Sequence, residues 1–133
     1  MKEVWKQWVL HKNLLRKYSI DEVVDTLDGV KIRMGDVNQK VDIIFSDSVS
    51  AYRSVEEGFR QNLINDLIDQ YGSDFITKCT FFQVENSKFL NWLIEESYGF
   101  IDAPEIKHFS FLASNSILDV VANYEPEIII HDF

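Results

Sequence analysis

Cysteine is almost absent from this chain of 133 residues, where Cys79 is the only one. A single thiol cannot form a disulfide within the chain, so a disulfide-stapled fold is excluded. Proline and glycine are also scarce, with two and five copies, and neither gathers into a linker between domains. We therefore expect a single domain over residues 1–133, a usual size for one hydrophobic core.

Long hydrophobic runs are missing as well. Apolar stretches such as residues 128–130 fall far short of the roughly 20 residues that a membrane-spanning helix needs. The N-terminal residues lack the apolar core of a signal peptide. Together with the single cysteine, which suits a reducing compartment, these features predict a cytoplasmic protein without membrane association.

The sequence contains no recognisable catalytic or cofactor signature. It has neither a G-x-G-x-x-G nor a P-loop pattern, and no serine lies in a G-x-S-x-G elbow. His11, His108 and His131 are too far apart for the local ligand pairs of zinc sites. Cys79 begins an expected buried strand, where thiols are usually inert. We expect no catalytic residue, no metal and no cofactor.

Negative charge is what this chain has in excess. Residues 1–45 carry eight Lys/Arg and seven Asp/Glu, whereas residues 46–133 carry five Lys/Arg and fifteen Asp/Glu. With 46% hydrophobic residues the chain is too apolar for a disordered acidic tail. An acidic domain repels phosphate backbones and attracts basic surfaces, which predicts a basic protein partner and disfavours nucleic acid.

The N-terminal segment runs against this trend, because basic and aromatic residues alternate in it. Such a pattern can bind nucleic acid. In a domain this acidic we expect the segment instead to pack across the acidic part or to be solvated. The residues concerned are Lys2, Lys6, Lys12, Arg16 and Lys17, interleaved with Trp5, Trp8 and Tyr18.

The clearest turn signal is the pair Asp28-Gly29 between two apolar runs. It predicts a type I′ hairpin in which Leu27 faces Val30 and Val23 faces Met34. Residues 41–45 alternate as a further strand with residues 41, 43 and 45 facing inward. A strand within residues 10–21 is a weaker expectation, and residues 4–9 fit a short helix or an irregular arm.

Two helices are expected in the middle of the chain. Ser54 and Glu57 match a capping box, and an apolar stripe follows as far as Gly72. Residues 80–84 form a short strand, and Ser87 then caps a second helix that ends at Gly99.

The chain returns to strands near residues 108–113, 117–122 and 127–131. This order predicts an α+β fold, with a largely antiparallel sheet and two helices packed on one face.

The acidic residues on the polar faces of these helices are the candidate contacts for a basic partner. Adjacent acids such as Glu95 and Glu96 point about 100° apart on a helix, so neither they nor Glu56-Glu57 form a two-carboxylate catalytic clamp. The candidates are Asp66, Asp69, Glu95 and Glu96, with Asp102 and Glu105 in the following loop.

In size and layout the chain resembles small immunity proteins that Firmicutes encode beside polymorphic toxins. The resemblance rests on the Trp5/Trp8 entry, the strand pair around Asp28-Gly29, Phe45 onward into Tyr52-Arg53, His108-Phe-Ser-Phe-Leu, Ile117-Leu-Asp-Val-Val and Glu125-Pro126. It implies a stoichiometric inhibitor of a cognate toxin domain, often a nuclease, and assigns no residue a role.

Two other functional classes remain as alternatives. A small enzyme could assemble its cleft from dispersed residues such as His108, Asp119, Tyr52 and Arg53. A structural subunit could instead use the surplus of Trp and Phe at the interface of a homo-oligomer.

Overall fold

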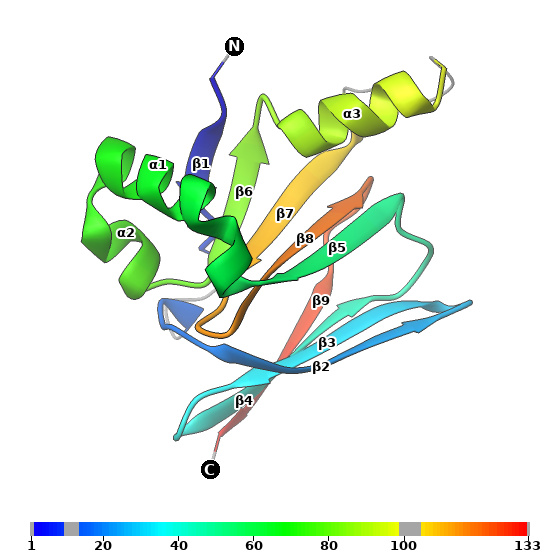
Figure 1. Ribbon diagram of the computed structural model, residues 1–133. Coiled ribbons are helices and arrows are strands. Elements are labelled where there is room, and N and C mark those ends of the chain that lie inside the picture. Colours follow the sequence, from blue (N-terminus) through cyan, green and yellow to red (C-terminus); the bar gives the residue numbers. More distant parts are fainter. Residues whose placement is uncertain (1, 10–13, 99–104, 133) are drawn as a thin grey trace.

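In the computed structural model, which describes residues 2–9, 14–98 and 105–132, the chain folds as α+β with two antiparallel sheets. The sheets pack face to face, and the helices lie on the outer face of the larger one (Figure 1). This confirms the predicted fold class. What the sequence did not indicate is that the strands divide between two sheets.

The five-stranded sheet has the order β1-β6-β7-β8-β5. The expected strands near residues 80–84, 108–113 and 117–122 are confirmed here. The N-terminal segment is neither a helix nor an arm, because it pairs with β6 as an edge strand. The strands are β1 (Val4–Gln7), β5 (Ala51–Glu56), β6 (Phe81–Glu85), β7 (Lys107–Leu112) and β8 (Ser116–Ala122).

The four-stranded sheet has the order β2-β3-β4-β9. Its inner face carries the alternate residues that the strand pattern predicted, including the fully buried Ile32, Met34, Val41 and Ile43. The strands are β2 (Ser19–Thr26), β3 (Gly29–Gly35), β4 (Gln39–Phe45) and β9 (Glu127–Asp132).

The main core fills the space between the sheets. Phe109, Phe111 and Leu118 of the larger sheet meet Phe45 and Ile32 of the smaller one. Trp8 closes one side of this cluster, with its ring centroid 4.8 Å from that of Phe109. Residues 108–113 and 117–122 of the larger sheet are buried throughout, between the smaller sheet and the helices.

The first hairpin is confirmed, but its predicted register is wrong. Thr26 pairs with Gly29, so the two turn residues are Leu27 and Asp28 and the turn is not a type I′ turn around Asp28-Gly29. Val23 pairs with Ile32 instead of Met34, and Leu27 is fully exposed at the tip. The Thr26 hydroxyl accepts a hydrogen bond from the Asp28 N–H at 3.1 Å, which stabilises this turn locally.

The prediction of a capping box at Ser54 is wrong. Ser54 lies in β5 and pairs with Leu118 of β8, because backbone pairing along the sheet edge outweighs a local capping signal. A 3-10 turn, η2 (Glu57–Arg60), follows, and helix α1 (Gln61–Tyr71) begins seven residues later than expected. Phe59, which falls within the span of the expected apolar stripe, is exposed. The predicted stop at Gly72 is confirmed, since its N–H bonds to the Ile68 carbonyl at 2.8 Å.

The second predicted helix is α3 (Lys88–Glu96), and its cap is confirmed: the Ser87 hydroxyl accepts from the Leu90 N–H at 2.9 Å. The expected stop at Gly99 lies outside the described residues. A short helix, α2 (Ser73–Thr77), packs with α1 over Trp5, Phe82 and Ile117 of the larger sheet. Among the helices described, none is both long and apolar enough to cross a bilayer.

Candidate functional site

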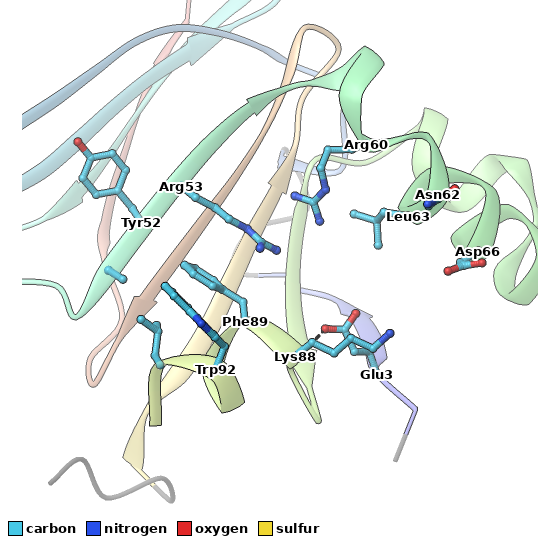
Figure 2. Close-up of a pocket in the computed structure, with 12 residues that line it drawn as sticks. Glu3, Tyr52, Arg53, Arg60, Asn62, Leu63, Asp66, Lys88, Phe89 and Trp92 are labelled. Atoms are coloured by element: carbon cyan, nitrogen blue, oxygen red, sulfur yellow. Dashed lines mark hydrogen bonds between the residues drawn. The ribbon is translucent and has the colours of Figure 1, made fainter. Parts of the chain in front are cut away.

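An open cleft of about 920 Å³ lies on the outer face of the larger sheet, where α1 and α3 leave part of the sheet uncovered. Figure 2 shows Arg53 entering it from β5, Arg60 from η2 and Trp92 from α3, whereas the Tyr52 side chain points away from these residues. A site of this size suits a small molecule or a few residues of another chain. We therefore take this cleft as the candidate functional site.

The floor of the cleft contains two arginines that share one buried carboxylate. Arg53 Nε lies 2.8 Å from Asp119 Oδ2, and an Arg60 terminal nitrogen lies 3.2 Å from the same oxygen. β5 and β8 pair Arg53 directly with Asp119, which explains how residues 66 positions apart meet. Asp119 is fully buried, whereas both arginine side chains reach the cleft.

Asp119 remains ionised in this position. Burial by itself raises the pKa of Asp119, but the hydrogen bond from His108 and the charge and hydrogen bond of Arg53 outweigh burial and lower the pKa well below its usual range. The floor of the cleft therefore holds a permanent negative charge beneath two permanent positive charges.

A chain of hydrogen bonds leads from this carboxylate to the start of α3. His108 Nε2 lies 2.7 Å from Asp119 Oδ1, and His108 Nδ1 lies 2.7 Å from the Ser87 hydroxyl. Since an ionised carboxylate only accepts, Nε2 carries the hydrogen that Asp119 receives. Ser87 in turn accepts from the Leu90 N–H, so its hydroxyl hydrogen is free to be donated to Nδ1. The network ties the N-terminus of α3 to the sheet.

This network has a hydrolase-like order of serine, histidine and acid, but its geometry differs from a catalytic triad. The two imidazole nitrogens are used in the reverse sense, with the serine on Nδ1 and the acid on Nε2. Ser87, His108 and Asp119 are all buried, and none of them lines the cleft. We therefore interpret the three residues as a polar support for the cleft floor.

An aromatic wall faces the arginines. Phe89 and Trp92 of α3 are stacked with ring centroids 6.2 Å apart and an interplanar angle of 14°. The Arg53 guanidinium carbon lies 4.3 Å from the Phe89 ring centroid, a cation–π contact that holds Arg53 against the wall. Trp92 remains 54% exposed, so its face is available to a ligand.

Four of the predicted contact acids lie on the helices that cover the larger sheet, and the structure brings only part of the predicted set together. Asp66 lines the cleft, and together with Asp69 it lines a smaller neighbouring pocket of about 280 Å³. Glu95 and Glu96 lie on the exposed side of α3, and Glu105 is exposed before β7. Asp102 lies outside the described residues.

The four residues named for the enzyme alternative come closer together than their spacing in sequence indicates. Arg53, His108 and Asp119 form one network, and Tyr52 lines the same cleft. The Tyr52 hydroxyl, however, donates to Asp25 Oδ2 at 3.1 Å, across to β2. Both ring nitrogens of His108 are engaged inside the protein, so neither faces the cleft.

The basic N-terminal segment does not present its aromatic residues to solvent. Trp5, Trp8 and Tyr18 are buried. Lys6 pairs with Glu85 at 2.8 Å and Arg16 with Asp36 at 3.2 Å, which agrees with packing against acidic residues.

Lys17, in the same segment, points its ammonium group at backbone carbonyls, including that of Ile76 at 2.6 Å. Burial lowers the pKa of Lys17 to about 8. This ammonium group therefore satisfies carbonyl groups of the fold and is not displayed for a polyanion.

The described part of the chain offers neither a metal-binding cluster nor an exposed thiol outside the cleft. Across residues 2–9, 14–98 and 105–132, no three His, Cys, Asp or Glu side chains are arranged to hold a metal ion. Cys79 is buried, and burial raises the pKa of its thiol. A raised pKa keeps the thiol protonated and weakly reactive at neutral pH.

Sequence reasoning missed Arg60, Phe89 and Trp92 as cleft residues. The sequence predicts a helix that already includes Arg60, whereas α1 begins only at Gln61. Phe89 and Trp92 lie on a helix that is apolar around most of its surface, so nothing in the pattern separates cleft residues from core residues. One signal was available, because His108 and Asp119 interrupt strands that are otherwise apolar. Polar residues at such buried positions usually belong to a hydrogen-bonded network.

Comparisons with protein-family models, with curated proteins and with solved structures found no match to this chain. The resemblance to small immunity proteins therefore stays a prediction. The residues and geometry of the chain itself are the basis for any functional proposal.

Proposed function

We propose that this protein is a binding module that docks a basic protein through the acidic helical side of its larger sheet. The observation that carries the proposal is a set of exposed carboxylates without a cationic partner in the part of the chain that the structure describes. They are Asp66, Asp69, Glu95, Glu96 and Glu105.

Several other acids of the chain are used within the fold. Asp21 pairs with Lys40, Asp36 with Arg16, and Glu85 with Lys6. The five helical-side acids make no such pair with any described residue. Like charges on one side of a small domain instead produce a field that attracts a basic surface and speeds encounter by orders of magnitude.

The exposed aromatic residues on this side supply a candidate anchor for the same contact. Trp92 lines the same cleft as Asp66 and keeps more than half of its surface accessible. Partly exposed tryptophans surrounded by polar groups are the residues that most often contribute strongly to binding. The helical side of the larger sheet therefore combines negative charges that attract a basic partner with an exposed aromatic side chain that can contact it.

Within this class we propose an inhibitor of a toxin domain, as the resemblance to small immunity proteins implies. The basic surface of a nuclease, which binds a polyanion, complements the acidic side described above. The test is to express the proteins encoded next to this one, alone and together with it. We expect one of them to stop growth alone, and growth to be restored by co-expression with co-purification as a stoichiometric complex. If no neighbour is toxic and none co-purifies, the inhibitor proposal is wrong.

A homo-oligomer is distinguished from this proposal by sedimentation at micromolar concentration. A monomer leaves the acidic side free for another protein, whereas an obligate oligomer would bury it against a copy of the same charge. For an enzyme, the distinguishing result is turnover that is lost when Arg53 or Tyr52 is replaced while the fold is retained.

A further inference from the structure

The two arginines in the floor of the cleft keep most of their hydrogen-bonding capacity. A guanidinium has five N–H donors, and Arg53 and Arg60 each use one of them on the same oxygen of Asp119. Among the described residues no other acceptor meets either group. Figure 2 shows the two side chains extending toward each other in the cleft, so their spare donors converge on one region.

This region carries an unbalanced charge. Two guanidinium groups face one carboxylate, which leaves one positive charge in a setting where the arginine side chains are only 40% and 17% exposed. Partly buried charges are screened less by salt than surface charges, so an anion binds here more strongly than at an exposed lysine. The same cleft also holds Glu3, Asp66 and Lys88, whose summed charge is negative and disfavours a ligand with more than one negative charge.

The aromatic wall beside the arginines favours a ligand whose uncharged part is apolar. The stacked Phe89 and Trp92 rings and the neighbouring Leu93 present an apolar surface to the cleft. A planar apolar group can stack on the exposed Trp92 face while an attached anion reaches the guanidinium groups.

We propose that the cleft is a binding site for a small organic acid with one carboxylate on an apolar or aromatic body. The carboxylate binds between Arg53 and Arg60, and the body packs against Phe89 and Trp92. The volume of about 920 Å³ lies within the usual range for small-molecule sites. This site goes beyond the proposed docking of a basic protein and does not depend on it.

The test is an NMR titration of the intact protein with indole-3-acetate and, in parallel, with its neutral analogue indole-3-acetamide. We expect the acetate to shift the resonances of the Arg53 and Arg60 side chains and of the Trp92 indole N–H in a saturable manner. The amide should bind at least about tenfold more weakly, because it lacks the charge that the arginines recognise. Equal binding of the two compounds, or no saturable shift with either, would overturn the proposal.

Two variants locate the site. Arg60→Gln should weaken binding of indole-3-acetate about tenfold, since it removes one of the two guanidinium groups. Arg33→Gln, on the smaller sheet, changes the net charge equally and should leave binding unchanged. Equal weakening by both variants would overturn the assignment to this cleft, because binding would then follow overall charge. If Arg60→Gln does not fold, the comparison of acid and amide on the unchanged protein still decides the proposal.

A third probe tests whether the anion belongs to a protein. The blocked dipeptide acetyl-Trp-Glu-amide offers a carboxylate and an indole on a peptide backbone. If this peptide shifts the Arg53 and Arg60 resonances and indole-3-acetate does not, the small-acid proposal is wrong and the cleft takes an acidic residue of a partner chain. If none of the probes binds, the small-acid proposal is wrong, but the proposed docking of a basic protein on the acidic side is not affected.

Discussion

The Ser87 hydroxyl lies 2.7 Å from Nδ1 of His108, although 21 positions separate the two residues in sequence. One side chain thus caps helix α3 and fixes the imidazole that supports Asp119. Because Asp119 in turn holds Arg53 and Arg60, the position of the cleft arginines depends on where α3 begins.

Replacing Ser87 by Ala tests this connection. The change removes the cap of α3 and leaves His108 Nδ1 buried without a partner. A lost cap costs about 1 kcal/mol, and an unsatisfied buried group costs about 1–3 kcal/mol. We therefore expect the free energy of unfolding, measured by urea denaturation, to fall by about 2–4 kcal/mol.

Ser54→Ala is the matched control for that experiment. Ser54 lies exposed in β5 and caps no helix. We expect a change within about 0.5 kcal/mol, the usual range for a surface substitution. A loss as large as that of Ser87→Ala would mean that Ser54 caps a helix after all.

Asp119→Asn should destabilise the protein strongly at neutral pH. The variant leaves Arg53, Arg60 and His108 without the carboxylate that they share. Removing one partner of a buried ionic network costs about 3–5 kcal/mol. Thermal and urea denaturation at pH 7 measure the loss.

The difference between the wild type and Asp119→Asn should shrink in acid. The pKa of Asp119 is lower in the folded protein than its usual value of about 3.9, so folding favours the ionised form. This contribution is complete above about pH 4 and declines below it, because the unfolded chain then binds a proton before the folded protein does. A difference that stays constant from pH 7 to pH 2.5 would contradict the assigned role of Asp119.

Gly29→Val should destabilise the first hairpin. The reason is not the type I′ turn expected from the sequence but the backbone conformation of Gly29 and its close approach to β4. Gly29 has φ of 131°, and a Cβ there would lie 2.0 Å from the backbone oxygen of Phe45. Backbone strain alone costs about 1–3 kcal/mol, and the overlap adds to it. We expect a loss of at least this size in denaturant unfolding.

Gly58→Ala is the control for the glycine substitution. A Cβ at Gly58 meets nothing closer than the Glu56 side chain at 3.8 Å. The stability should therefore change little, or rise slightly because alanine restricts the unfolded chain. Equal effects at both glycines would show that the close approach at Gly29 is not real.

Neutralising the helical-side acids should slow association with a basic partner. In the double variants Asp66→Asn/Asp69→Asn and Glu95→Gln/Glu96→Gln, we expect the association rate to fall more than the dissociation rate rises, because rim charges act mainly through the long-range field. Salt screens that field over about 8 Å at physiological ionic strength, so the variants should show a shallower salt dependence. Surface plasmon resonance at several salt concentrations measures both rates.

The control for these variants is Glu22→Gln/Asp28→Asn, which changes the net charge equally on the edge strand of the smaller sheet and in the turn that follows it. Its association rate should stay close to that of the wild type. If this control slows association as much as the helical-side variants do, net charge and not the acidic side governs the encounter.

Local patterns in the sequence determined most of the secondary structure. Alternation predicted the inward faces of β3 and β4, and the polar residue ahead of an apolar run predicted Ser87 as the cap of α3. These features depend on backbone geometry and on neighbours within a few residues, which the sequence displays directly. The excess of acids over residues 46–133 was also visible in the sequence.

The division of the strands between two sheets and the position of the cleft depend on contacts between residues far apart in the sequence. Ser54 carried a convincing helix signal, yet pairing with Leu118 on β8 made it part of a strand. Arg53, Arg60 and His108 meet at Asp119 because strands and turns distant in sequence converge there. Long-range pairing and burial set these contacts, and their free energies exceed the local preferences that a sequence pattern reports.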